Sequence, residues 1–141
     1  PQMRDHRRDL ETLTVKARAL MRQVGIEDLE RRDITQVSGG QLQRAGVCRA
    51  LMSSPKILFA DEPTGALNSK SSDEIMALFS EIHRTGTAIL LVTHDAKVAA
   101  RAQRVLFMQD GKIVSSLALS GAGSSAWKTE EILSKMKFLN I

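Results

Sequence analysis

The amino-acid sequence predicts an α/β fold in which helices cover a parallel sheet. Three short apolar runs, at residues 57–60, 88–92 and 105–108, are typical of strands buried on both faces. Helical patterns lie between these runs, at residues 71–84 and about 96–102. A strand, helix, strand order implies right-handed parallel crossovers, so we expect one α/β domain with a helical amino-terminal portion.

Two helices are expected before the first strand. Apolar residues recur at near-helical spacing over residues 14–24, and Gly25 follows as a natural stop. The next helix is expected to begin at Ser38, because Ser38 and Gln41 have the spacing of a capping box. It should end shortly before Pro55, since the residue preceding a proline disfavours helical backbone.

The helix at residues 71–84 has one apolar face, which we expect to be its core face. That face carries Ile75, Met76, Leu78, Phe79 and Ile82.

After the third strand, Asp110 and Gly111 predict a two-residue hairpin turn. Residues 115–126 are rich in Ser, Ala and Gly and are expected to form a flexible connection. A last helix over about residues 129–137 should offer three apolar side chains to a neighbour: Ile132, Leu133 and Met136. We therefore divide the chain into a helical portion (residues 1–54), part of an α/β core (55–116), and a linker with a terminal helix (117–141).

Composition limits the classes of partner. The 43% hydrophobic and 26% charged content is that of a soluble globular domain, and no apolar run approaches the roughly 20 residues of a membrane span. The net charge of +4 is modest and aromatic residues are only 4%, so no nucleic-acid partner is expected. The single cysteine, Cys48, cannot form an internal disulfide and suits a small buried helix position.

The helix start at Ser38 is a candidate anion site. Gly39 and Gly40 occupy its first two positions, where they remove the Cβ atoms that would keep a phosphate from the amide row. The alternative is a plain capped helix, because a serine cap with glutamine three residues later is common.

Two carboxylates follow the first buried strand, at the kind of strand end where α/β proteins bind ligands. Asp61 could hold Mg²⁺, and Glu62 could orient and deprotonate an attacking water. His94 ends the next strand and could donate a hydrogen bond to a γ-phosphate. The alternatives are solvated carboxylates and a surface or packing histidine.

In this order, the motifs resemble the ATP-binding subunit of ABC transporters over about residues 12–114. The matching segments are the family signature (Ser38, Gly39, Gly40 and Gln41), the Walker B strand (residues 57–62), the D-loop (residues 65–68) and the switch histidine, His94. Residues 60–67 and 92–101 look most like exporters of bacitracin and other antimicrobial peptides. The resemblance implies an ABC ATPase sheet of the P-loop NTPase type with a helical subdomain.

The resemblance also implies cofactors and partners. Two such subunits face each other head to tail, so residues 38–41 would bind the ATP of a second nucleotide-binding subunit. Asp61 would serve Mg²⁺, and Glu62 and His94 would be catalytic toward ATP held in their own subunit. The subunit would pair with a transmembrane permease on the inner face of the cell membrane. In the D-loop, Asn68 stands where the family usually has Asp, which puts coupling between the two ATP sites in question.

No segment reads G-x-x-x-x-G-K-[ST], the loop that cradles nucleotide phosphates. We therefore interpret the chain as the carboxy-terminal portion of an ATPase subunit and expect it to be inactive alone. The alternative is a non-enzymatic truncated module that supplies its signature to an intact subunit. An ATPase of the DNA-repair or chromosome-organising branch is disfavoured, because no long heptad segment interrupts the fold.

In the family, the P-loop strand lies between the strands at residues 88–92 and 105–108. Without it these two strands have unpaired edges, which invite pairing with other chains. The isolated chain is expected to dimerise by exchanging elements, to pair the two strands directly, or to aggregate.

Overall fold

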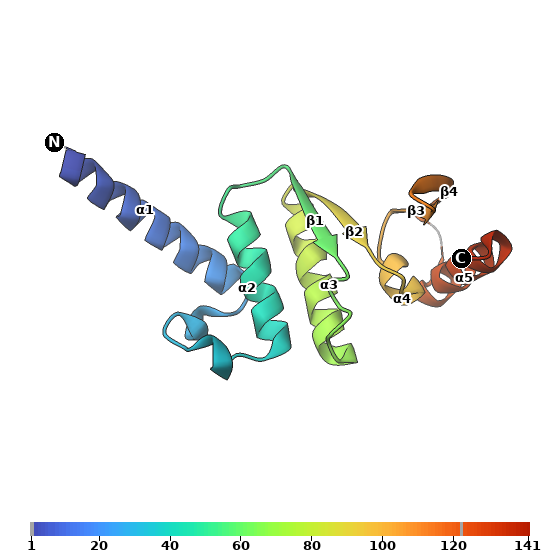
Figure 1. Cartoon of the computed structure of the whole chain (residues 1–141), viewed down its shortest axis with the longest axis horizontal. Coiled ribbons are helices and arrows are strands. Elements are labelled where there is room, and N and C mark those ends of the chain that lie inside the picture. The colour runs from blue at the N-terminus through green and yellow to red at the C-terminus, as the bar shows by residue number, and fades with distance from the viewer. Residues whose placement is uncertain (1, 122) are drawn as a thin grey trace. The chain divides into compact units, whose positions relative to one another are not determined.

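The computed structural model describes residues 2–121 and 123–141, with side chains described from Asp9 onward, and shows two compact units (Figure 1). The first unit ends at Leu90 and the second comprises Leu91–Ile141. The first contains α1 (Gln2–Gln23), the 3-10 helices η1 (Glu27–Leu29) and η2 (Ile34–Gln36), α2 (Gly39–Leu51), β1 (Ile57–Asp61) and α3 (Ser69–Arg84). After β2 (Ala88–Val92), the second contains α4 (Ala96–Ala99), β3 (Arg104–Gln109), β4 (Lys112–Ala118) and α5 (Ser125–Leu139).

Helix α1 is longer than predicted but stops where Gly25 was expected to stop it. Gly25 has φ +69°, a left-handed conformation that glycine adopts without steric cost. The Ile26 amide donates to the Met21 carbonyl at 2.8 Å, and the Gly25 amide donates to the Arg22 carbonyl at 3.0 Å. These are the two bonds of a Schellman motif, which satisfies the last carbonyls of the helix.

Helices α2 and α3 follow the predicted pattern. Asn68 caps α3, its Oδ1 accepting from the Ser71 amide at 2.9 Å, so the helix begins two residues earlier than expected. All five apolar residues predicted for its core face are buried. Cys48 is buried in α2 as expected, and this burial raises the pKa of its thiol.

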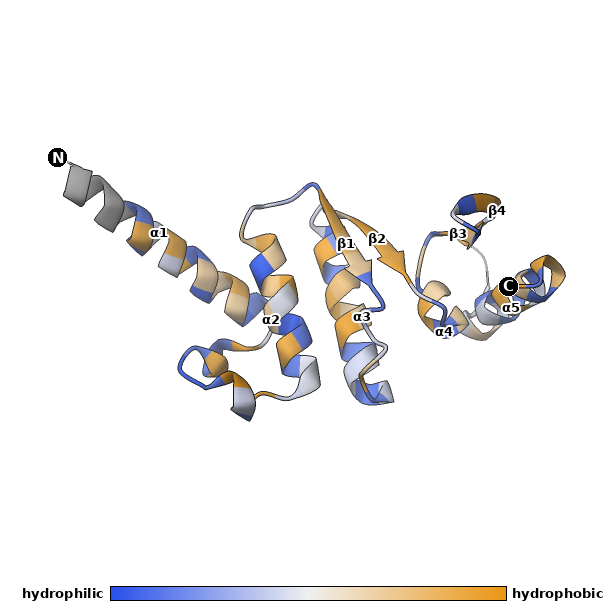
Figure 2. Cartoon of the chain, in the orientation of Figure 1, coloured by the Kyte–Doolittle hydropathy of each residue, from blue (hydrophilic) through white to orange (hydrophobic). Residues whose placement is uncertain are grey.

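Strands β1 and β2 form a two-stranded sheet, and their arrows run in the same direction in Figure 1. Both strands are strongly apolar (Figure 2). The expectation that they are buried on both faces was wrong. Leu58 is 6% exposed, but its neighbour Phe59, on the opposite face, is 70% exposed. Within the described residues, only one face of β1 is covered.

Strands β3 and β4 form the predicted hairpin. Asp110 and Gly111 have φ of 50° and 74°, and two positive φ values at the central positions are the requirement of a type I′ turn. The antiparallel register runs from Gln109 opposite Lys112 to Arg104 opposite Ala118. The expected flexible connection was therefore wrong for residues 115–118, which are strand. These residues form a strand because they pair with β3, although their composition is rich in Ser and Ala. Side chains alternate between the two faces of a strand, and this alternation turns Leu117 toward the core.

Helix α5 closes the core of the second unit. Ser124 caps it, its Oγ accepting from the Trp127 amide at 3.3 Å, so the helix begins four residues before the predicted start. Of the three side chains offered to a neighbour, Ile132 and Met136 pack as predicted, but Leu133 is 53% exposed. The buried cluster consists of Ala96, Ala100, Phe107, Leu119 and Ile132.

The order of strands leaves β2 and β3 in different sheets of the described chain. Direct pairing of these two strands, one of the three outcomes expected for the isolated chain, is not what the structure has. Self-association through strand edges stays a prediction. No helix in the described part of the chain is both long and apolar enough to cross a membrane.

Candidate functional site

The start of α2 has the geometry of an anion-binding helix terminus. Ser38 has extended backbone, its Oγ accepts from the Gln41 amide at 3.3 Å, and its own amide donates to Gln41 Oε1 at 3.0 Å. The capping box is therefore confirmed. Gly39 and Gly40 are the first two helical residues, so neither amide has a side chain of its own residue beside it.

The start of α3 lies against the start of α2. A Cβ atom on Gly40 would lie 3.3 Å from both Cβ and Oγ of Ser71, and one on Gly39 would lie 3.5 Å from Leu67 Cδ2. Both helices begin at their lower ends in Figure 1 and run side by side. Two positive helix termini therefore share one edge, which we call the helix-start edge (residues 38–41 and 67–71). This edge brings the predicted signature and the predicted D-loop residue, Asn68, together in one unit.

Glu62 has a strained backbone. Its φ of 42° lies in the left-handed region, which is unusual for a residue other than glycine and disfavoured before a proline. The Gly65 amide donates to the Glu62 carbonyl at 3.1 Å, closing a turn. A Cβ on Gly65 would lie 4.0 Å from Glu62 Oε2, so the glutamate side chain lies over this turn. No local pattern predicted this conformation, because it runs against the preference of a residue that precedes proline.

Replacing Glu62 by glycine is expected to yield a protein about 0.5–1 kcal/mol more stable than replacing it by glutamine. Glycine relieves the left-handed strain, which outweighs the larger entropy of its unfolded chain. Urea denaturation followed by far-UV circular dichroism measures the difference. At Glu81, an exposed residue within helix α3, the same pair of changes should have the opposite sign, since glycine weakens a helix. Equal signs at both positions would rule out strain at Glu62.

Asp61 and His94 are both exposed. Asp61 ends β1 in the first unit, whereas His94 lies in the second unit, between β2 and α4. Beside His94, Asp95 Oδ1 accepts from the Lys97 amide at 2.7 Å and thereby caps α4. The convergence of Asp61, Glu62 and His94 at one site stays a prediction.

The number of acidic, histidine and cysteine side chains that lie together limits which metal sites the described residues can form. Among residues 2–121 and 123–141, no group of three or more His, Cys, Asp or Glu side chains could hold a metal ion. Mg²⁺ commonly uses only one or two protein carboxylates, together with phosphate oxygens and water. An exposed Asp61 at a strand end fits that mode of binding.

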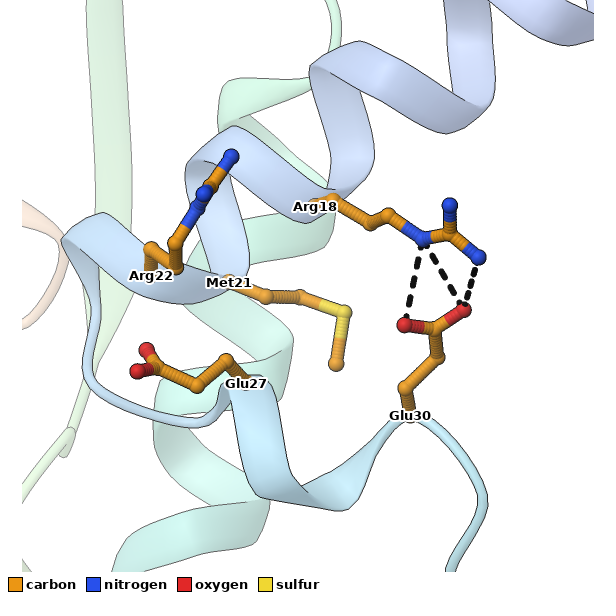
Figure 3. A pocket seen from close by; sticks show the side chains of 5 residues that line it. All are labelled: Arg18, Met21, Arg22, Glu27 and Glu30. Carbon is orange, nitrogen blue, oxygen red and sulfur yellow. Dashed lines mark hydrogen bonds and ion pairs between the residues drawn. The ribbon is translucent and has the colours of Figure 1, made fainter.

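A cavity of about 220 Å³ lies elsewhere, between α1 and η1 (Figure 3). Its lining consists of Arg18, Met21, Arg22, Glu27 and Glu30. Arg18 and Glu30 form an exposed ion pair with N–O distances of 2.7–3.1 Å. The hydrogen bond raises the pKa of Arg18 and lowers that of Glu30. The volume is below the usual 300–1,000 Å³ of ligand pockets, and no predicted site residue lines it.

Comparison with known proteins finds relatives among ABC transporters. The family model described as "ABC transporter" matches residues 2–65. The macrolide export ATP-binding/permease protein MacB of Rhodopseudomonas palustris is 44% identical over 119 residues, 84% of this chain and 17% of MacB. The uncharacterized ABC transporter ATP-binding protein YvrO of Bacillus subtilis is 46% identical over 99 residues, 70% of this chain and 43% of YvrO.

The similarity extends to solved structures. The dimeric post-hydrolysis structure of the ATP-binding cassette MJ0796, bound to ADP and Pi, has a TM-score of 0.66 at 34% identity. The match covers 76% of this chain and 47% of MJ0796. The chain thus spans less than half the length of each of these three proteins.

Proposed function

The chain is part of an ABC transporter ATP-binding domain, and on that premise we propose that it presents the helix-start edge to ATP held by a second cassette. In the complete subunit this contact serves hydrolysis of MgATP that powers export. The given 141 residues contain no phosphate-binding loop motif, and the helix-start edge is the part of the site that would act on a partner's nucleotide.

The observation that carries this proposal is the pairing of the two helix starts. A γ-phosphate placed at residues 38–41 would meet the amides of Gly39 and Gly40, which carry no side chains of their own, and the positive ends of both helices. The Ser38 hydroxyl lies at the same position and can turn to donate to a phosphate oxygen. Asn68 completes the edge as a neutral cap, which adds no negative charge to repel the phosphate.

The remaining site residues act on nucleotide in their own subunit. We assign Asp61 to Mg²⁺, which when bound supplies charge neutralisation of the phosphates. Glu62 accepts a proton from the attacking water, and His94 donates a hydrogen bond to the γ-phosphate. The strained turn at Glu62 supports this assignment, because strain of this kind clusters at active sites.

An antimicrobial compound is our proposal for the exported substrate. Residues 60–67 and 92–101 resemble exporters of bacitracin and related peptides, and the relative MacB is named a macrolide exporter. Both bacitracin and macrolides are antimicrobial. Partners would be a second ATP-binding subunit and a membrane permease, with the chain peripheral on the inner face of the membrane. Residues 1–54 would form the signature subdomain, residues 55–116 the core part, and residues 117–141 the closing segment.

Mixing the chain with an intact cassette tests this function. Alone, the chain is expected to bind labelled ATP more weakly than about 1 mM and to release no phosphate with Mg²⁺. With MJ0796, light scattering should detect a mixed dimer in ATP and EDTA that is absent without nucleotide. Submillimolar binding with Mg²⁺-dependent turnover by the chain alone, or no ATP-dependent mixed dimer, would contradict the proposal.

The non-enzymatic truncated module is the second candidate, and the capped helix-start edge that it would present supports it. It predicts the same mixed dimer. Sequencing the DNA immediately upstream of the codon for Pro1 separates the two, since an in-frame G-x-x-x-x-G-K-[ST] segment identifies part of a complete subunit.

A further inference from the structure

Arg44 ties three helices of the first unit together. It lies on α2, and its side chain is 21% exposed. One guanidinium nitrogen, Nη1, donates to the carbonyl of Val24, at the end of α1, at 2.8 Å. The other, Nη2, donates to Glu74 Oε2 on α3 at 3.0 Å. A single side chain on the signature helix therefore reaches both neighbouring helices.

The geometry requires an arginine. The planar guanidinium presents donors in a fixed fork, so it can bind two acceptors in different directions, whereas a lysine ammonium is a single point charge. The Val24 carbonyl also lies at the negative end of α1, where a cation is favourable. Gly25 makes room for this contact, because a Cβ there would lie 3.2 Å from Arg44 Nη1.

The contact between Arg44 on α2 and Glu74 on α3 lies close to the helix-start edge. Arg44 lies about one helical turn beyond Gly40, and Glu74 lies about one turn beyond Ser71. At the edge itself the two glycines have no side chains with which to set the distance between the helices. The Arg44–Glu74 ion pair links α2 to α3 about one turn from that edge.

We propose that Arg44 is a positioning residue for the trans ATP contact: by binding Val24 and Glu74 it aligns the starts of α2 and α3 toward the same phosphate. This inference rests on the proposed function. If Arg44 has this role, replacing it should weaken ATP-dependent dimer formation more than it lowers the stability of the fold.

The experiment measures the ATP concentration that gives half-maximal mixed dimer of the 141-residue chain with MJ0796 in EDTA, together with urea stability of each variant. Arg44→Met should raise that concentration about tenfold, and Arg44→Lys, which keeps one of the two contacts, should recover part of the loss. Glu74→Gln leaves the Val24 contact in place and should give an intermediate rise. Arg49→Met, an exposed change in the last turn of the same helix, should leave the concentration unchanged.

The outcomes separate the two proposals. If the unaltered chain forms no ATP-dependent mixed dimer, the proposed function fails. If it does, but folded Arg44 variants need no more ATP than the unaltered chain, the positioning role is overturned. Should Arg44→Met fail to fold, Glu74→Gln decides the matter, because an unchanged ATP requirement in that folded variant also overturns the inference.

Discussion

Replacing Ile132 by alanine is expected to unfold the second compact unit at room temperature. Ile132 is 1% exposed and belongs to the buried cluster with Phe107 and Leu119. Removing such a side chain costs about 2–5 kcal/mol, whereas a unit of about 50 residues has a total stability of roughly 3–8 kcal/mol. The loss is therefore comparable to the stability of the whole unit.

The only tryptophan of the chain, Trp127, lies on the same helix, so its fluorescence during urea titration reports on this unit. Leu133→Ala is the matched control. It alters the next residue of α5, which is 53% exposed, and should change the free energy of unfolding by no more than about 0.5 kcal/mol. Similar losses at both positions would show that α5 does not pack as the structure has it.

Replacing Gly39 by aspartate should abolish the ATP-dependent mixed dimer while leaving the chain folded. A carboxylate at a helix start stabilises the helix by about 0.3–1 kcal/mol, but it repels a phosphate from the same amides. Its Cβ would make only ordinary contact with Leu67 Cδ2, at 3.5 Å. We expect more than about a hundredfold loss of affinity for ATP-loaded MJ0796, measured by analytical ultracentrifugation.

Gly46→Asp provides the matched control for this change. It introduces the same charge on the same helix, and outside its chain neighbours and the backbone of its own helix no described atom lies within 4 Å of a Cβ at Gly46. Because Gly46 lies about two turns from the helix-start edge, mixed-dimer formation should persist. If the two variants associate equally well, the phosphate does not lie at the start of α2.

The sequence was most informative where a feature depends on neighbouring residues. The capping box of Ser38 and Gln41, the stop at Gly25, and the turn at Asp110 and Gly111 were all predicted and are confirmed. Each depends on local hydrogen bonds or on the φ angles open to one or two residues, which composition and spacing encode directly. The core face of α3 was also predicted, because helical periodicity reports one covered face.

Features that depend on distant partners were predicted less well. The composition of residues 115–118 predicted a flexible connection. They form a strand because they pair with residues 104–107, which lie elsewhere in the sequence. The exposure of Phe59 was missed for a similar reason, since an apolar run shows that a strand can be buried but not which of its faces has a cover.

By itself, then, the sequence determined the identity and order of the motifs, the helix caps and the hairpin turn, because each resides in a few consecutive side chains. Only the tertiary structure decided that Gly40 lies against Ser71, that Arg44 binds both Val24 and Glu74, and that Glu62 adopts a left-handed backbone. The first two depend on packing between helices far apart in the chain. The third opposes local preference and persists because the surrounding turn holds it there.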